Sequence, residues 1–163
     1  YLGSPYGTIV LEAAEMAEQG RSKNEIVAHV EDLVGRLKLY FLVDTLEYLA
    51  KGGRIGNASA LLGGLLQIKP ILTIKDGQVD QFDKARTHKR AFARLVDLVK
   101  EEIAPDGKGR LTIMHADAMD EAKKLAEALA LVAGVDEVPI YDVPPAITTH
   151  GGPGVLGVGF FTE

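Results

Sequence analysis

Cationic side chains lie beside glycines or at an expected helix start in three segments of this 163-residue chain. Arg54 lies in the run GGRI, Arg86 lies in the run KARTHKR, and His150 starts the run HGGPG. Cationic side chains next to exposed backbone amides bind carboxylates and phosphates. The three segments therefore predict an anion site assembled from distant parts of the chain.

The HGGPG run is the most specific of the three. Gly151 and Gly152 predict a nest of backbone amides that turn inward toward an anionic group. His150 beside them has a side chain that can donate to a carboxylate or phosphate, and its charge responds near neutral pH. A lone histidine usually has no special role, but the adjacent glycines and proline favour a functional one.

Arg86 is predicted to lie where a strand passes into a helix that Thr87 caps. His88, Lys89 and Arg90 then crowd the first turn, where the helix dipole is already positive. For Lys89 and Arg90 a solvated basic face explains the pattern equally well. For Arg86, at the junction itself, we favour contact with an anion.

Arg54 is predicted to follow directly after a helix end. Asp44 and Glu47 have the spacing of a capping box that starts this helix, and Gly52-Gly53 should end it. The alternative role for Arg54 is that of a surface arginine that complements the helix dipole.

A nearly all-apolar helix is predicted from Asn57 to about Gln67. Its internal pair Gly63-Gly64 costs about 1 kcal/mol per residue relative to alanine. Either close helix packing or room for an apolar ligand would compensate for this cost, and packing is the commoner reason.

The remaining patterns predict an α/β (α+β-like) fold with a mixed sheet, a β-hairpin and flanking helices. Residues 1–37 are expected to form a helical hairpin leading into one α/β domain, residues 38–163. His115, at a strand end, is either a site residue or a group that caps the following helix. The other expected features are helices at 4–19, 22–37, 87–103 and 120–133, strands at 38–43, 110–114, 138–143 and 155–161, a hairpin turn at Asp76-Gly77, and turns at 105–107 and Pro144-Pro145.

Composition argues against several classes of function. The net charge is −5, which disfavours general nucleic-acid binding, and the chain has no cysteine for thiol catalysis. Its four histidines lack metal-ligand spacing, so we expect no metal site. No apolar run reaches the ~20 residues of a membrane-spanning helix. We expect a cytoplasmic protein without stable membrane insertion, and the start at Tyr1 is typical of a fragment or processed product.

Three runs, taken in order, resemble the DegV family of bacterial fatty-acid-binding proteins over essentially the whole chain. They are DTLEYLAKGGRIGNASALLGGLLQIKPIL, then KARTHKR, then THGGPGVLGVGF. The resemblance implies two α/β domains that hold a long-chain fatty acid between them. This chain would be the C-terminal domain, with the N-terminal domain absent. The apolar surface thereby exposed would be covered by self-association of the fragment.

By position, the resemblance places His150 near the ligand head group and gives Arg54 and Arg86 roles in head-group electrostatics and partner docking. It implies a binding protein, with no cofactor and no catalytic residue, that presents the fatty-acid carboxylate to a separate ATP-dependent fatty acid kinase.

Two alternatives remain at this stage. The chain could be an enzyme acting on a phosphorylated small molecule, with His150 as acid or base and Arg54 and Arg86 holding the phosphate. Alternatively, its basic face could serve only to dock an acidic partner.

Overall fold

The computed structural model describes residues 2–62, 68–104 and 109–163. Within these ranges six strands form one sheet in the order β3-β2-β1-β6-β4-β5. β4 and β5 pair in parallel and the other neighbours pair antiparallel, so the predicted mixed sheet is confirmed. The strands are β1 Leu37–Leu42, β2 Lys69–Lys75, β3 Gln78–Ala85, β4 Thr112–Ala116, β5 Ile140–Asp142 and β6 Val155–Phe161.

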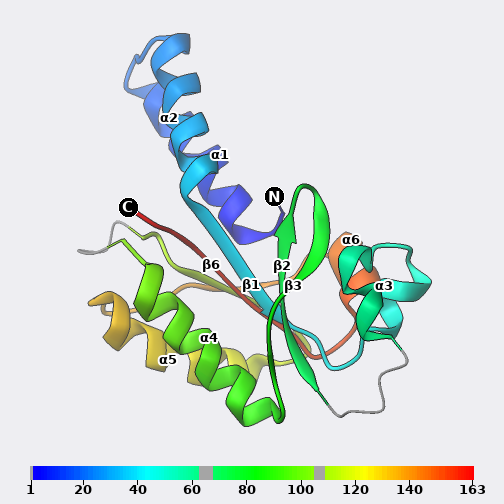
Figure 1. Ribbon diagram of the computed structural model, residues 1–163. Helices are drawn as coiled ribbons and strands as arrows, with labels where there is room; N and C mark the ends of the chain where they lie inside the picture. Colours follow the sequence, from blue (N-terminus) through cyan, green and yellow to red (C-terminus); the bar gives the residue numbers. More distant parts are fainter. Residues whose placement is uncertain (1, 63–67, 105–108) are drawn as a thin grey trace.

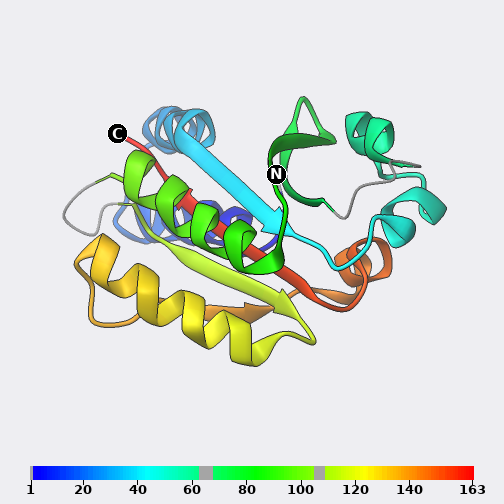
Figure 2. The ribbon, with the colours of Figure 1, turned by 60° about the horizontal axis from the view of Figure 1, so that its bottom comes forward.

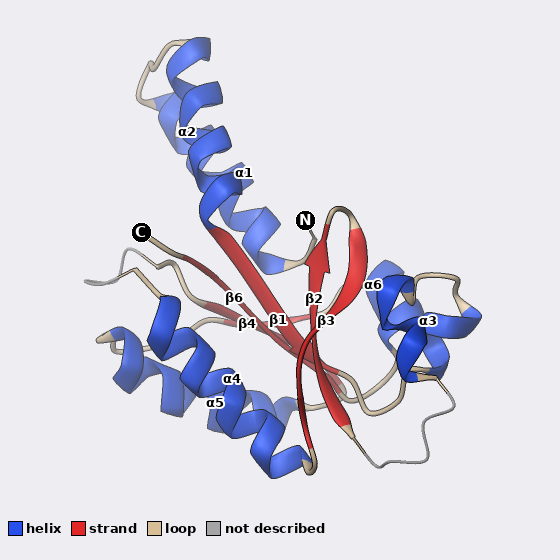
Figure 3. Ribbon diagram, in the orientation of Figure 1, coloured by secondary structure: helices blue, strands red, loops and turns tan. Residues whose placement is uncertain are grey.

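The helices form three groups around this sheet (Figure 1). Helices α4 and α5 lie side by side along one face, as both Figure 1 and Figure 2 show. The α1–α2 hairpin projects from one end of the sheet, and α3 and α6 lie together at the other (Figure 3). The helices are α1 Ser4–Glu18, α2 Lys23–Arg36, α3 Glu47–Lys51, the 3-10 helix η1 Gly56–Leu61, α4 His88–Glu102, α5 Met119–Ala133 and α6 Pro145–Gly151.

Strand β6 lies at the centre of the sheet and divides the core in two. Its residues Leu156, Val158 and Phe160 belong to the buried cluster that α4 and α5 cover. Its alternate residues, from Val155 to Phe161, face the opposite side, because successive strand side chains point to opposite faces. The two groups of helices at the ends of the sheet cover this opposite face.

Each end of that opposite face is closed by a different group of helices. Phe161 packs with Ile9 and Leu33 of the α1–α2 hairpin. One step inward, Pro5 of α1 lies so close to Gly159 that a Cβ there would come within 2.5 Å of the proline ring. At the other end, Val155 shares a buried cluster with Leu49 of α3. The middle of the face, around Gly157, lies between these two covers.

Several local predictions are confirmed. The helix predicted from residue 22 begins with a capping box of Ser22 and Glu25, and the predicted Thr87 cap is present, since its hydroxyl accepts from the backbone N–H of Arg90 at the start of α4. Asp76 and Gly77 join β2 to β3 with φ angles of 50° and 77°, as a type I′ hairpin turn requires.

The helix predicted to start at Asp44 begins later, at Glu47, and Leu46 is in the N-cap position. The Asp44 carboxylate packs against Gly154 instead of capping α3, and the Thr45 hydroxyl accepts from the Glu47 N–H instead. The Ser4 hydroxyl forms a 2.8 Å hydrogen bond with that of Thr112 on β4, so Gly3 occupies the N-cap position of α1.

Other boundaries also differ from the sequence prediction. The described part of the expected apolar helix is the short η1, after which Leu62 is extended; Gly63-Gly64 and the turn at 105–107 lie outside the described residues. The predicted extended turn at Pro144-Pro145 is wrong, since α6 begins at Pro145. Leu37, assigned to the hairpin, is the first residue of β1.

The α1–α2 hairpin is joined to the rest of the protein through Glu12. Its carboxylate accepts from Arg110 next to β4 and lies 3.1 Å from the His29 ring of α2. His29 is half-buried at this contact. Burial raises the pKa of Glu12, but hydrogen bonds and charges from Arg110 and His29 outweigh burial, so the pKa is below its ordinary value.

We expect Glu12→Gln to lower the free energy of unfolding at pH 7 by about 1 kcal/mol. Because the folded-state pKa of Glu12 is the lower one, its stabilisation is present above the unfolded-state pKa and is lost as the pH falls through the folded-state value. The difference between the wild type and the variant should therefore shrink below about pH 4.

Urea unfolding measured across pH checks this prediction. Glu15→Gln is the matched control, because Glu15 lies exposed on the same helix and has no described ion pair. A stability difference for Glu12→Gln that stays constant down to pH ~3 would contradict the assigned pairing.

Candidate functional site

A pocket of about 200 Å³ opens in the middle of the sheet face that α4 and α5 do not cover. It lies between the start of α1 and the α3–α6 group. The lining combines strand side chains with residues from α3 and α6. These residues are Leu2, Leu39, Phe41, Leu49, Arg54, Ile74, Val79, Met114, Val143, Ala146, Ile147, His150, Gly151, Val155 and Gly157.

Gly157 forms the floor of this pocket. It pairs with Phe41 on β1 and with Met114 on β4, and both neighbours line the pocket. A Cβ on Gly157 would lie 3.4 Å from the Phe41 Cβ and 3.6 Å from the Met114 Cε, which is ordinary contact distance. The absent side chain at the centre of the sheet therefore leaves space above β6.

Two polar side chains, Arg54 and His150, lie among the apolar lining residues. Arg54 is exposed, and its Nη1 donates to the Gly52 carbonyl at 3.0 Å. The Nδ1 atom of His150 is buried and has no hydrogen-bond partner in the described part of the chain. An apolar hollow with an arginine and a histidine among its lining residues suits a ligand with a hydrocarbon tail and an acidic head.

The position of Arg54 follows from how α3 ends. Gly53 has a φ of 66°, a conformation that glycine adopts at low cost. The Arg54 N–H then donates to the Leu49 carbonyl at 2.9 Å and the Gly53 N–H to Ala50 at 3.1 Å, as in a Schellman motif. The predicted double-glycine stop is confirmed, and it places Arg54 at the pocket.

The predicted amide nest is not observed. The N–H of Gly152 donates to the Thr148 carbonyl at 2.8 Å, and that of Gly154 to Ala116 at 2.7 Å. These amides complete α6 and join it to β4, so they do not point together at an anion. Gly151 still lines the pocket, and Gly152 borders a shallow neighbouring hollow beside Tyr48.

Arg86 is not among the residues that line the pocket shared by Arg54 and His150. It follows Ala85, the last residue of β3, and is exposed. Its guanidinium has no ion pair or hydrogen bond with another described residue. The structure therefore brings two of the three predicted cationic side chains together, while Arg86 lies on the surface at the β3–α4 junction.

The other histidines have structural contacts. His115 is 4% exposed, and its Nδ1 accepts a 3.4 Å hydrogen bond from the Ala118 N–H, just before α5. His88 lies 3.3 Å from Glu121 and joins α4 to α5. Among the described residues, no three His, Asp or Glu side chains lie close enough to hold a metal ion.

Comparison with known proteins shows the family to which the chain belongs. A family model described as an uncharacterised protein of the DegV family matches residues 1–163. The chain belongs to the DegV family. A DegV domain-containing protein of Clostridium acetobutylicum is 41% identical over 157 residues, covering 96% of this chain and 55% of the relative. The chain thus spans about half the length of the curated relatives it matches.

Solved DegV structures share the fold. A fatty-acid-binding DegV family protein of Streptococcus agalactiae superposes with a TM-score of 0.87 at 33% identity, over 98% of this chain and 56% of that one. A DegV family protein of Ruminococcus gnavus, refined with vaccenic acid, gives 0.78 at 28% identity, over 93% and 54% respectively. These two solved DegV proteins are thus described as binding a fatty acid or as refined with one.

Several residues that line the pocket were not predicted as site residues from the amino-acid sequence of this chain. Met114 and Ile147 lie in patterns that indicated only a strand and a turn, and Leu2 lies near the chain start, where only a helix was predicted. Gly52 was identified only as a helix stop, yet it contacts His150.

In the part of the chain that the structure describes, no helix has both the length and the hydropathy needed to cross a membrane.

Proposed function

We propose that this DegV chain binds a long-chain fatty acid and presents its carboxylate to an ATP-dependent fatty acid kinase. The observation that carries the proposal is the apolar pocket with Arg54 and His150 among its lining residues. The tail lies over Gly157, between Phe41 and Met114, and the carboxylate lies beside Arg54, His150 and the Gly151 backbone. The fatty acid is the bound ligand, and the reaction itself belongs to the kinase.

The energetics favour the tail as the main source of affinity. Each buried methylene contributes about 0.8 kcal/mol, whereas a hydrogen bond to a charged group contributes about 1.5–3 kcal/mol. The polar side chains thus select an acid over a neutral lipid and set its direction. A phosphorylated substrate gains less support, because Arg54 and His150 are the only charged or titratable side chains lining the described pocket.

A second domain completes the site in this proposal. The described pocket, about 200 Å³, is smaller than the roughly 300–1,000 Å³ typical of ligand pockets. Residues 1–37 lead into the C-terminal domain, 38–163, and an N-terminal domain like that of the resembling proteins covers the tail. Where that domain is missing, self-association covers the same surface. We place the protein in the cytoplasm, where the kinase finds ATP.

Native mass spectrometry followed by lipid extraction tests the proposal. The expected result is a bound fatty acid that survives gentle desolvation and is identified after extraction. A protein that takes up no fatty acid when incubated with excess palmitic acid, yet hydrolyses phosphate esters alone, would support the enzyme alternative instead.

Arg86 has the partner-docking role in this proposal. It is exposed, and its guanidinium lacks a partner among the described residues, so it is available to an acidic surface. We expect Arg86→Ala to leave palmitate affinity within twofold and to lower the rate of kinase-dependent acyl phosphate formation about tenfold, as for losing one interfacial charge pair.

The control for Arg86 is Arg21→Ala, which removes an exposed arginine paired with Glu25 at the far tip of the α1–α2 hairpin. Kinase rates are measured over a range of concentrations of the fatty-acid-loaded protein. The apparent KM for that protein then reports docking. Equal kinase rates for Arg86→Ala and the wild type would remove the docking role from the proposal.

A further inference from the structure

Helices α3 and α6 are held together by two contacts of the same kind, each formed by a ring and a glycine. The His150 ring of α6 lies on Gly52, where a Cβ would come within 2.1 Å of the His150 Nδ1. The Tyr48 ring of α3 lies on Gly152, where a Cβ would come within 2.4 Å of the Tyr48 Cδ2. Each helix thus provides the ring that packs on the C-cap glycine of the other.

The two glycines after α3 have different roles. Gly53 has a φ of 66° and no described atom within 4 Å of an added Cβ, so the turn requires glycine there but the surroundings do not. Gly52 has a φ of −78°, an ordinary value for any residue. At Gly52 the requirement is space alone, and the group that occupies the space is the His150 ring.

Gly52 also contacts the second head-group candidate. Its carbonyl accepts from the Arg54 Nη1 at 3.0 Å, and its N–H donates to the Tyr48 carbonyl at 2.9 Å. One residue therefore touches both polar side chains of the pocket and the aromatic residue that packs on α6. A shift of Gly52 would change the positions of His150 and Arg54 together.

We infer that Gly52 is a positioning residue for His150 and Arg54, and that Tyr48 supports it by keeping α6 packed on α3. The inference rests on the proposed function, since it assigns Gly52 the task of placing the two groups that select the fatty-acid carboxylate. The Tyr48 contribution comes from its ring, because its hydroxyl has no hydrogen-bond partner among the described residues.

The test compares palmitic acid with hexadecanol, which has the same tail but no carboxylate. In Gly52→Ala the added methyl displaces the His150 ring, so we expect about a tenfold loss of palmitate affinity and less than a twofold change for hexadecanol, as when a charged hydrogen bond is lost. Gly35→Ala on α2 is the control, because no described atom lies within 4 Å of a Cβ there and the residue does not line the pocket. It should keep the wild-type acid-to-alcohol ratio.

Tyr48 provides a second test if Gly52→Ala folds poorly. Tyr48→Ala should lower the acid-to-alcohol ratio, and Tyr48→Phe should restore it because the ring remains. If Gly52→Ala leaves the ratio of palmitate to hexadecanol affinity unchanged, the positioning role is overturned. Fatty-acid binding by the wild type would still stand. A wild type that binds neither ligand overturns the proposed function and the inference together.

A measurement without ligand checks the geometry itself. In the wild type we expect a nuclear Overhauser effect between the Gly52 Hα protons and the His150 ring, and we expect it to be weakened in Tyr48→Ala but retained in Tyr48→Phe. Its absence from the wild-type spectrum overturns the inference whatever the binding data show.

Discussion

Replacing Gly157 with valine is expected to lower the affinity for long-chain fatty acids about thirtyfold while leaving the fold intact. The new Cβ has contacts no closer than 3.4 Å, so the strand accepts it, and valine suits a strand better than glycine does. Its two methyl groups occupy the pocket floor. Excluding two or three methylenes of the tail costs about 2 kcal/mol.

A fatty-acid series measured by displacement of a fluorescent lipid checks the prediction for Gly157→Val. Octanoic acid, whose tail covers less of the floor, should lose less affinity than palmitic acid. The matched control is Gly7→Val on α1, where no described atom lies within 4 Å of an added Cβ and the residue does not line the pocket. If Gly157→Val binds palmitic acid as well as the wild type does, the tail does not lie on β6.

Removing both polar side chains from the pocket is expected to produce the second large effect. His150→Ala and Arg54→Ala should each weaken palmitate binding about tenfold, since a hydrogen bond to a charged group contributes about 1.5–3 kcal/mol. The double variant should lose less than the product of the two factors, because the two side chains would share one carboxylate. Hexadecanol affinity should stay within twofold in all three variants.

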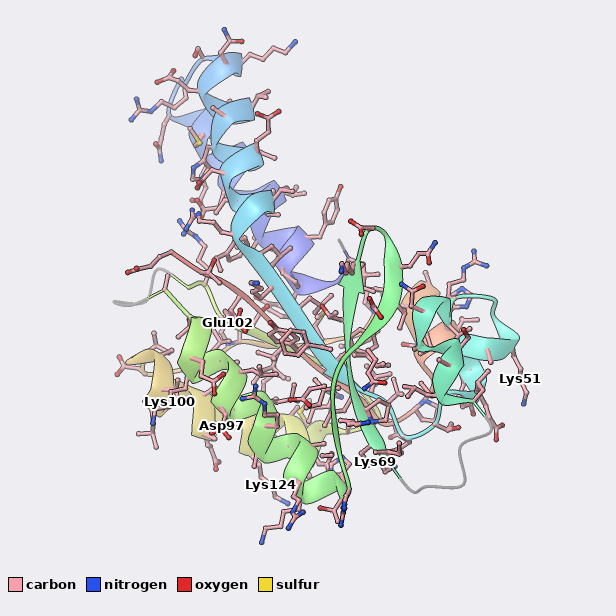
Figure 4. All side chains as sticks on the ribbon, in the orientation of Figure 1. Lys51, Lys69, Asp97, Lys100, Glu102 and Lys124 are labelled. Carbon is pink, nitrogen blue, oxygen red and sulfur yellow. The ribbon has the colours of Figure 1, made fainter. Side chains whose placement is uncertain are left out.

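Isothermal titration calorimetry with both ligands measures these affinities. Lys51→Ala is the control for Arg54→Ala, because it removes a cation from the same segment. The Lys51 side chain pairs with Glu47 and points away from the sheet (Figure 4). Losses of equal size for the acid and the alcohol would show that His150 and Arg54 support the pocket wall without contacting a carboxylate.

The sequence by itself determined the features whose causes are local. Ser22 and Glu25 bond to each other's backbone three residues apart, and Asp76-Gly77 permits the positive φ angles of its turn. Gly52-Gly53 ended α3 as predicted. In each case the decisive interaction lies within a few residues, so residue type and spacing contain the necessary information. The long ordered runs were also enough to indicate the DegV family.

Only the tertiary structure decided how distant groups compete for the same atoms. The Ser4 hydroxyl could cap α1, but it forms a hydrogen bond with the hydroxyl of Thr112 on β4 instead. The amides of Gly152 and Gly154 looked available to an anion, but the carbonyls of Thr148 and Ala116 accept from them, since a buried amide must find a partner.

Tertiary packing also decided which residues share the pocket. Arg54 and His150 meet because α3 and α6 pack together, while Arg86 is left on the surface by the direction in which β3 ends. Spacing along the chain cannot show that Gly52 lies under the His150 ring, because 98 residues separate them and only packing across the sheet end brings them into contact. Sequence determines which side chains are available, and the packing of the elements decides which of them share a pocket.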